Sequence, residues 1–331
     1  MPVQITIIGL GQIGASIGLA LKARRASVTL VGHDKDARTA KAAQEAGAVD
    51  TWKYNLPDSV RDARIVILAL PLAEVRETLE VIAPDLQEGT LVLDTALSKG
   101  TVAAWAKELL PQGRFYVGIF PAIHPDHLHG IDYGVRAARA DLFEKSVTVV
   151  TAPYGTPENV FKLTTDFISL LGSLPLLMDT AEADGLLGKV HVLPQLIAAA
   201  LLDATLDHPG WLEAKKLAAR PYAAVTSGFA YHDDAVSLRD VSLETRENTV
   251  RLLNSYIASL VQLRDEIEAG DRDALGARLE NAWGGRVRWF EERHGAEWLN
   301  REAQKIDTPS FGERVNQLLF GSALSDRSKR K

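Results

Sequence analysis

Short apolar runs recur through the first 180 residues, and a segment with the spacing of an amphipathic helix follows most of them. Runs without polar alternation are typical of strands buried on both faces, as in a parallel sheet with helices on either side. We therefore predict a doubly wound α/β domain over residues 1–179. Its strands are expected at residues 4–8, 28–34, 63–71, 89–96, 114–121, 146–153 and 174–179.

The pattern changes near residue 180, where strand signals end and helical spacing continues. Long helical periodicities cover residues 181–206, 213–220, 238–269 and 271–295. We therefore predict an all-α second domain over residues 180–322. A basic tail, residues 323–331, is expected to be disordered.

The helices of the second domain carry wide apolar faces. The most apolar stretch, residues 190–206, includes His191 and Asp203, so we interpret it as a buried helix of a bundle and not as a membrane span. Apolar positions such as Ile257 and Leu260 recur on the later helices and exceed what one small sheet can cover. We therefore expect a homodimer formed through this domain.

A glycine-rich turn joins the first predicted strand to the first predicted helix. In its Gly-x-Gly-x-x-Gly spacing, Gly9 permits the tight turn, Gly11 lets a pyrophosphate approach the backbone, and Gly14 lets helix and strand pack closely. The phosphates of a dinucleotide would lie at the helix N-terminus, where N–H groups favour anions. Asp34, after the second strand, would accept hydrogen bonds from the ribose hydroxyls and repel a 2′-phosphate, which favours NAD over NADP. The predicted cofactor-binding residues are Gly9, Gly11, Gln12, Ile13, Gly14, Asp34, Leu70 and Pro71.

The chemistry is expected in loops that follow later strands, because ligands of open α/β sheets lie beyond the carboxyl ends of the strands. These loops are residues 70–72, 94–100 and 121–125. Hydride transfer from an alcohol leaves a hydroxyl proton, and histidine is well matched to accept it near neutral pH. We therefore predict that His124 is the catalytic base. His127 and His129 have a spacing that could bind a metal, but no carboxylate–histidine cluster supports this, and we predict no metal site.

Other polar residues are weaker candidates. Ser98 and Lys99 could hydrogen-bond the reacting hydroxyl or a substrate carboxylate, although Ser98 is equally well placed to cap the next helix. Lys189 and His191 lie near the start of the second domain. Either could act as an acid or base, but Lys189 could equally be an exposed surface residue and His191 a buried residue with a structural role. An arginine would clamp a carboxylate through its guanidinium fork. The candidates are Arg220, Arg239 and Arg246, of which we select Arg239.

Composition narrows the function classes. The 331 residues include 46% hydrophobic and 24% charged residues, as in an ordinary globular protein. A net charge of −6 argues against nucleic-acid and membrane-surface partners. The absence of cysteine excludes disulfides and thiolate catalysis, and it fits a reducing compartment. We therefore expect a cytoplasmic protein that acts on a small molecule.

Several segments occur in the order and spacing seen in prephenate dehydrogenases, and the chain resembles that family over residues 4–295. In the first domain these segments are GLGQIGASIGLALK, VGHDKD, VILALPL, DTALSKG, IHPDHLHG and ADLFEK. VHVLPQLIAAALL and RENTVRLLNSYIASLVQLRDEIEAGD resemble the helical dimerisation domain of the family. The resemblance implies NAD-dependent oxidation of prephenate, a small carboxylate substrate, to 4-hydroxyphenylpyruvate in tyrosine biosynthesis, with loss of carbon dioxide. His124 matches the histidine of the family's HPMAG-type motif and would be the base.

The sequence departs from the family pattern at the substrate site. Leu97 stands where the family loop has serine, and the serine here falls one position later, at Ser98. The two histidines of the family's HLPH motif correspond to Val192 and Gln195, and we predict that Gln195 contacts the substrate. The family's substrate-binding arginine has no clear counterpart. Three alternatives stay open: an arogenate dehydrogenase, a hydroxyacid dehydrogenase that uses Lys189, and a dinucleotide-binding protein without catalysis.

Overall fold

The computed structural model describes residues 3–130, 132–229 and 235–296. The described residues divide into two compact units, with the boundary between Asp184 and Gly185. The division falls slightly after the predicted boundary between residues 179 and 180, because the start of helix α7 (Thr180–Leu187) belongs to the first unit. The predicted basic tail lies outside the described residues.

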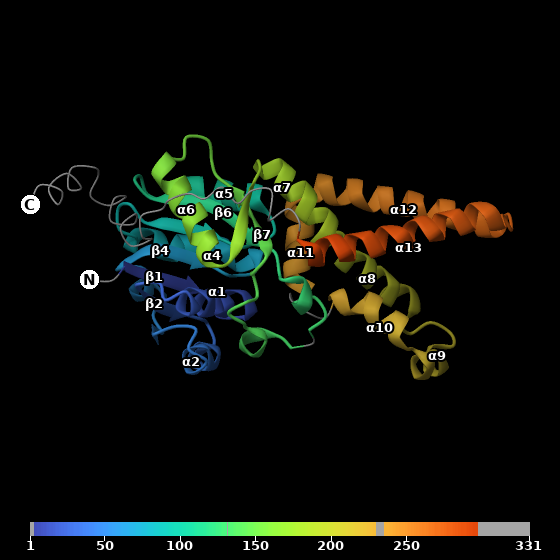
Figure 1. Cartoon of the computed structure of the whole chain (residues 1–331), viewed down its shortest axis with the longest axis horizontal. Coiled ribbons are helices and arrows are strands. Elements are labelled where there is room, and N and C mark those ends of the chain that lie inside the picture. Colours follow the sequence, from blue (N-terminus) through green and yellow to red (C-terminus); the bar gives the residue numbers. More distant parts are fainter. Residues whose placement is uncertain (1–2, 131, 230–234, 297–331) are drawn as a thin grey trace, which may run out of the picture. The chain divides into compact units, whose positions relative to one another are not determined.

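A sheet forms the centre of the first unit (Figure 1). It has eight strands in the order β3-β2-β1-β4-β5-β6-β7-β8. The order 3-2-1-4-5-6 is that of the Rossmann fold, in which the strand sequence reverses direction beside the first strand. The predicted doubly wound α/β class is therefore confirmed. The strands are β1 (Val3–Ile8), β2 (Val28–His33), β3 (Thr51–Trp52), β4 (Ala63–Leu68), β5 (Leu91–Asp94), β6 (Phe115–Pro121), β7 (Ser146–Thr151) and β8 (Ser173–Leu177).

Strand β7 runs antiparallel to β6, with Ile119 opposite Val150, whereas a parallel sheet was predicted throughout. The described residues between these two strands form only short 3-10 turns. A parallel return requires a long crossover, usually an α-helix, and without one the chain simply reverses. The connection from β7 to β8 contains the helix α6 (Glu158–Leu170), and these two strands are parallel.

The helices of the first unit bury the faces that the apolar spacing indicates. Helix α4 (Leu72–Ile82) buries Val75, Leu79 and Ile82, which recur along one stripe. Helix α1 (Gln12–Ala23) buries Ile17 and Leu21 in the same way. The remaining elements are α2 (Ala37–Glu45), α3 (Leu56–Val60), η1 (Ala83–Asp85), α5 (Lys99–Leu109), η2 (Pro125–His127) and η3 (Gly134–Ala137).

The central strands are buried on both faces. Ile7 of β1, Ile67 of β4 and Leu93 of β5 have no exposed surface. Complete burial of such a side chain stabilises the fold by about 1.5–3 kcal/mol. This packing fixes the carboxyl ends of the three strands side by side, and the loops that carry the candidate residues begin there.

Every element described in the second unit is helical, which confirms the predicted helical region after the sheet. Helix α7 continues through a π-turn, η4 (Gly188–Val192), into α8 (Leu193–Thr205). The other elements are α9 (Trp211–Leu217), α10 (Arg220–Thr226), η5 (Ser227–Phe229), α11 (Ala235–Glu244), α12 (Arg246–Glu268) and α13 (Arg272–Gly295).

Among the described residues, one continuous helix, Thr180–Thr205, is long and apolar enough to cross a membrane, with a mean hydropathy of 1.6 in its most apolar stretch. Only 22% of its most apolar stretch is buried, so the expectation that residues 190–206 form a buried helix is not met among the described residues. Leu187 and Val192 are buried, whereas Leu186 and Val190 are exposed. The helix packs along one stripe only, and that stripe is narrower than its apolar composition suggested.

Candidate active site

Three glycines shape the turn between β1 and α1. Gly9 has φ +88°, and a Cβ atom there would lie 2.3 Å from the backbone oxygen of Ala69. A Cβ atom at Gly14 would lie 1.9 Å from the backbone oxygen of Gly9. At Gly11, by contrast, a Cβ atom would meet no described atom within 4 Å. The fold therefore requires Gly9 and Gly14, whereas Gly11 leaves an open approach to the backbone, as a bound phosphate needs.

The N-terminus of α1 favours an anion beside this opening. Its first turn contains no acidic residue, and the N-cap residue is Gly11, which has no side chain to cap it. Gln12 donates from Nε2 to the backbone oxygen of Ala137 at 3.3 Å, and its Oε1 atom is buried without a hydrogen-bond partner among the described residues. Ile13 packs partly buried against the core. These features fit the pyrophosphate of a dinucleotide.

Asp34 follows β2, and its carboxylate lies against the glycine turn. Oδ2 accepts a hydrogen bond from the Leu10 N–H at 2.9 Å, and Oδ1 accepts one from the Asp36 N–H at 2.9 Å. These two bonds orient a half-buried carboxylate at the edge of the turn. The adjacent cation, Lys35, forms an ion pair with Glu74 of α4.

Leu70 and Pro71 come from the neighbouring strand end, after β4. The Cδ2 atom of Leu70 would lie 2.9 Å from a Cβ atom at Gly9, so its side chain lies against the glycine turn. Pro71 is the N-cap residue of α4, with φ −56°. Both residues are half-buried and lie at the same edge of the sheet as the turn.

His124 lies in the loop that follows β6. Its backbone N–H donates to the backbone oxygen of Leu142 at 2.7 Å, which fixes the loop to the segment 140–144. The imidazole is 18% exposed, and its Nδ1 atom accepts a hydrogen bond from the Asp126 N–H at 3.2 Å. Burial lowers the pKa of His124, although the Asp126 carboxylate opposes this shift. The ring is therefore neutral and accessible near pH 7, as a proton acceptor must be.

A second histidine and a carboxylate stand beside His124. The ring centroids of His124 and His127 lie 5.6 Å apart, and Nε2 of His127 lies 3.4 Å from Oδ1 of Asp141. Arg139 donates to the same carboxylate oxygen from Nε at 2.9 Å and holds the pKa of Asp141 below its usual value. The ADLFE segment, residues 140–144, thus anchors the histidine loop, a role that the sequence had not indicated. Among the described residues, no three histidine or acidic side chains are arranged to hold a metal ion.

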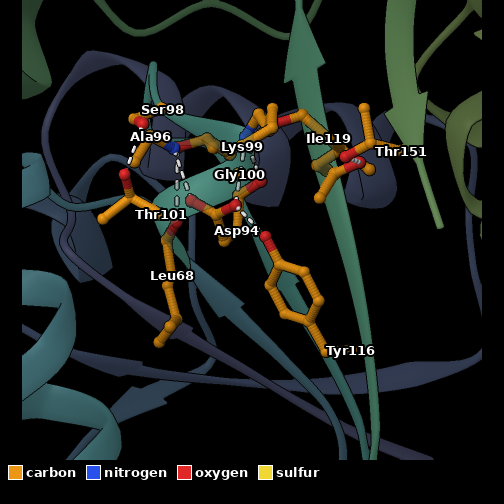
Figure 2. Close-up of polar contacts among 12 residues, drawn as sticks. Leu68, Asp94, Ala96, Ser98, Lys99, Gly100, Thr101, Tyr116, Ile119 and Thr151 are labelled. Atoms are coloured by element: carbon orange, nitrogen blue, oxygen red, sulfur yellow. Dashed lines mark hydrogen bonds and ion pairs between the residues drawn. The ribbon is translucent and has the colours of Figure 1, made fainter. Parts of the chain in front are cut away.

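Ser98 and Lys99 are fully buried, which corrects their predicted contacts with the substrate. The Nζ atom of Lys99 donates to Oδ2 of Asp94 at 3.0 Å, to the backbone oxygen of Asp94 at 3.0 Å and to the backbone oxygen of Ile119 at 2.6 Å (Figure 2). An ammonium has three donors, and all three are used inside the protein. The Ser98 hydroxyl donates to Oγ1 of Thr101 at 2.8 Å. Neither side chain reaches a ligand in this arrangement.

Tyr116 and the backbone of Ala96 complete this buried cluster around Asp94, and the sequence analysis predicted neither contact. The Tyr116 hydroxyl donates to Oδ2 of Asp94 at 2.8 Å, and the Ala96 N–H donates to Oδ1 at 2.7 Å (Figure 2). Burial raises the pKa of the Tyr116 phenol well above its ordinary value, and burial lowers the pKa of Lys99 despite the nearby carboxylate. Tyr116 stands in an apolar strand, so no local signal points to its polar partner.

The candidates of the second unit lie on two helices. Lys189 is exposed and His191 is half-buried, and both belong to η4, a π-turn of the kind often found at functional sites. Gln195 donates from Nε2 to the backbone oxygen of His191 at 3.0 Å. Arg239, on α11, is exposed and donates from Nε to Oδ1 of Asp240 at 2.6 Å. The adjacent carboxylate offsets its charge, so Arg239 is a weaker clamp for a substrate carboxylate than its sequence position indicates.

Known proteins resemble both units of the chain. A prephenate dehydrogenase from Lactococcus lactis subsp. cremoris is 28% identical over 298 residues, which are 88% of this chain and 78% of that protein. A cyclohexadienyl dehydrogenase from Zymomonas mobilis is 28% identical over 276 residues, 82% of this chain and 91% of that protein. The crystal structure of the A. aeolicus prephenate dehydrogenase with hydroxyphenyl propionate and NAD+ has a TM-score of 0.75 and 21% identity, and the match covers 87% of this chain and 98% of that one.

The glycine turn, the acidic residue after β2 and the doubly wound sheet define a nucleotide-binding protein of the Rossmann dehydrogenase class. Residues 17–174 match the family model described as prephenate dehydrogenase, nucleotide-binding domain. The chain is thus similar to prephenate dehydrogenases over most of its length. The predicted resemblance to that family and the assignment as a dehydrogenase are thereby confirmed.

Proposed function

We propose that this chain is an NAD-dependent prephenate dehydrogenase of tyrosine biosynthesis. It oxidises the ring hydroxyl of prephenate, passes the hydride to NAD+ and releases the ring carboxylate as carbon dioxide. One observation carries the proposal: His124, a half-buried histidine whose pKa is lowered by burial, lies in the loop after β6, at the sheet edge that also carries the glycine turn. The similarity to prephenate and cyclohexadienyl dehydrogenases supports the reaction class, and His124 in this loop would be the base.

The cofactor is NAD. Gly11 leaves the backbone open and the α1 N-terminus favours the pyrophosphate. We expect the Asp34 carboxylate, at the edge of the same turn, to accept hydrogen bonds from ribose hydroxyls. Bound NAD+ supplies the hydride acceptor. The negative charge of Asp34 repels a 2′-phosphate, and the nearby Lys35 is paired with Glu74. We therefore expect weaker binding of NADP than of NAD.

The proton follows a closed cycle through His124. The imidazole accepts the hydroxyl proton while the hydride leaves the same carbon, and a ring carbonyl forms. The carbon–carboxylate bond then breaks, its electron pair moves through the ring to the carbonyl oxygen, and carbon dioxide departs. His124 returns its proton to this oxygen, which yields the phenol of 4-hydroxyphenylpyruvate. One hydride is transferred, one carbon dioxide is released, and the base is regenerated without a net proton.

The hydrogen bond at Nδ1 sets a condition on this cycle. While Nδ1 accepts the Asp126 N–H, the neutral ring carries its proton on Nε2. Base action at Nε2 requires the other tautomer, with the proton on Nδ1. The negative charge of the Asp126 carboxylate, whose Oδ2 lies 3.8 Å from Nδ1 and so beyond hydrogen-bond distance, favours this second tautomer electrostatically.

Lys99 is buried, so other cationic residues would bind the carboxylates of the substrate. Lys189 and His191 on η4, with Gln195 one turn later, supply an exposed ammonium, an imidazole and an amide along one stretch of helix. We assign the substrate contacts to this stretch, with Arg239 as a secondary candidate because Asp240 offsets its charge.

The test is the reduction of NAD+ by a substrate panel of prephenate, arogenate and simple 3-hydroxyacids. We expect turnover with prephenate and loss of that turnover in His124→Asn. Turnover with arogenate alone, or with a hydroxyacid and dependence on Lys189, would replace the substrate proposed here. Cofactor binding with no turnover across the panel would make the chain a binding protein and would overturn the proposal.

We further propose that the chain is a cytoplasmic homodimer formed through its helical unit. Leu252 of α12 is buried, but Ile257 is 52% and Leu260 is 46% exposed, and α13 exposes Trp283. A second copy of the chain would cover these apolar faces and the exposed stripe of Thr180–Thr205, whose Lys189 and Asp203 are unsuited to a lipid environment. Sedimentation of the purified protein at twice the monomer mass is expected, and a monomer at micromolar concentration would contradict the dimer.

A further inference from the structure

The N-terminus of α5 is capped from a distant part of the chain. Ser98 occupies the N-cap position, but its side chain makes no capping hydrogen bond. The cap comes from Asp184 on α7: Oδ1 accepts the Lys99 N–H at 2.6 Å, and Oδ2 accepts the Gly100 N–H at 3.0 Å. Both groups belong to the first unit, and the carboxylate lies at the positive end of the helix dipole.

The capped residues are the same ones that hold the loop after β5 in place. From Lys99 the side chain reaches inward to Asp94 and to the backbone of β6 at Ile119, while the backbone N–H reaches outward to Asp184. The loop 94–100 is therefore fixed from two sides. Thr95 and Leu97, its half-exposed side chains, lie at the sheet edge of the candidate site.

We propose that Asp184 is a positioning residue: its carboxylate closes the N-terminus of α5 and thereby holds the loop 94–100 in the arrangement that hydride transfer needs. The effect on turnover rests on the proposed function, whereas the cap itself does not. Asp184 touches no reacting atom and acts through Lys99 and Gly100.

The Asp184 carboxylate is held at a cost in solvation, which its two backbone donors offset. Burial raises the pKa of the Asp184 carboxyl, the N–H groups of Gly100 and Lys99 oppose this shift, and Asp94 adds to it. The two backbone hydrogen bonds therefore offset the cost of holding this carboxylate away from water. Gly100 leaves room for it, since a Cβ atom there would lie 2.9 Å from Oδ2 of Asp184.

Two substitutions disturb this contact from opposite sides. Asp184→Asn keeps the shape of the side chain but replaces one acceptor oxygen by a donor, and Gly100→Ala pushes the carboxylate away. Each is expected to lower the hydrogen-exchange protection of the Lys99 and Gly100 amides about tenfold, within the range known for lost helix caps. Each should lower kcat by a similar factor and leave the Kd for NAD unchanged, because the glycine turn follows a different strand.

The double variant gives the decisive comparison. Because both changes break one contact, Asp184→Asn/Gly100→Ala is expected to lose no more kcat than the worse single variant. Gly185→Ala is the matched control: a Cβ atom there meets no described atom within 4 Å, so amide protection and kcat should stay at the wild-type level, and stability should not fall because alanine favours a helix interior more than glycine does.

Multiplied losses in the double variant would overturn the proposal. So would unchanged amide protection and kcat in both single variants, even with a lower melting temperature, because Asp184 would then be merely structural. If the wild-type chain itself shows no turnover on the substrate panel, the proposed function fails, and the exchange measurement still decides whether Asp184 caps α5.

Discussion

The Nζ atom of Lys99 lies 3.0 Å from Oδ2 of Asp94, and neither side chain has any exposed surface. This ion pair joins the end of β5 to the start of α5, and its third hydrogen bond reaches β6. A lysine after a strand end, which in the sequence resembles a substrate anchor, is in the structure an internal clamp. Together with Thr151, it explains Gly118, where a Cβ atom would lie 2.5 Å from Oγ1 of Thr151 and 2.9 Å from Cδ of Lys99.

Removing one partner of this pair should be costly. Lys99→Met leaves the Asp94 carboxylate buried and uncompensated, and we expect the free energy of unfolding in urea to fall by about 3–5 kcal/mol. Asp94→Asn/Lys99→Met removes both charges and should lose clearly less than the sum of the single variants. Lys35→Met, in an exposed pair with Glu74, is the control and should change stability by about 1 kcal/mol or less. Equal effects of the two lysine substitutions would contradict the clamp.

The glycine turn allows fold and cofactor binding to be separated. Gly14→Ala places a methyl group 1.9 Å from the Gly9 oxygen and should strongly destabilise the protein in thermal unfolding. Gly11→Ala meets no described atom within 4 Å, so the melting temperature should stay close to the wild-type value while NAD affinity falls at least tenfold by calorimetry. Unchanged NAD affinity in a folded Gly11→Ala protein would show that the dinucleotide does not approach this turn.

His124 is expected to dominate catalysis. His124→Asn keeps a polar side chain of similar reach but cannot accept the proton, so kcat should fall by about 10²–10⁴-fold while the Kd for NAD stays constant. His129→Asn changes an exposed histidine of the same loop and should retain wild-type turnover. Steady-state kinetics with prephenate and calorimetry with NAD measure the two quantities, and a His124→Asn enzyme with substantial turnover refutes the assignment.

The decline of kcat/KM at acid pH should follow the protonation of His124. Turnover requires the neutral ring, and burial lowers its pKa, so kcat/KM should decline only below the ordinary histidine value of about 6.5. The facing charges are Asp126 and Asp141, which raise the pKa, and His127 and Lys145, which lower it. Asp126→Asn should therefore move this decline to lower pH, and His127→Asn should move it to higher pH. Shifts in the same direction would exclude His124 as the titrating base.

Sequence reasoning succeeded where the relevant geometry is local. The turn at Gly9 and Gly14 and the placement of Asp34 depend on residues of one β-α-β unit, whose spacing is visible in the chain. The glycine geometry agrees with the roles expected from that spacing, because each role follows from the backbone alone.

Prediction from the sequence failed where a residue's role depends on a partner that is distant in the chain. Lys99 and Ser98 follow a strand end, as a catalytic residue would, but Asp94, Tyr116 and Ile119 bury the lysine, and only the packing of β5 against β6 brings them together. The predicted direction of β7 was also wrong, because nothing in its apolar pattern distinguishes a parallel from an antiparallel neighbour.

The sequence by itself determined the Rossmann-type domain, the helical region and the nucleotide-binding turn, because periodicity and glycine spacing are properties of neighbouring residues. Only the tertiary structure decided which polar side chains stay accessible. It buried Lys99 in an ion pair, left His124 accessible beside His127, and placed Asp184 as the cap of α5. The physical reason is desolvation: a charged group is committed to a partner once folding removes it from water, and that partner is set by contacts distant in the chain.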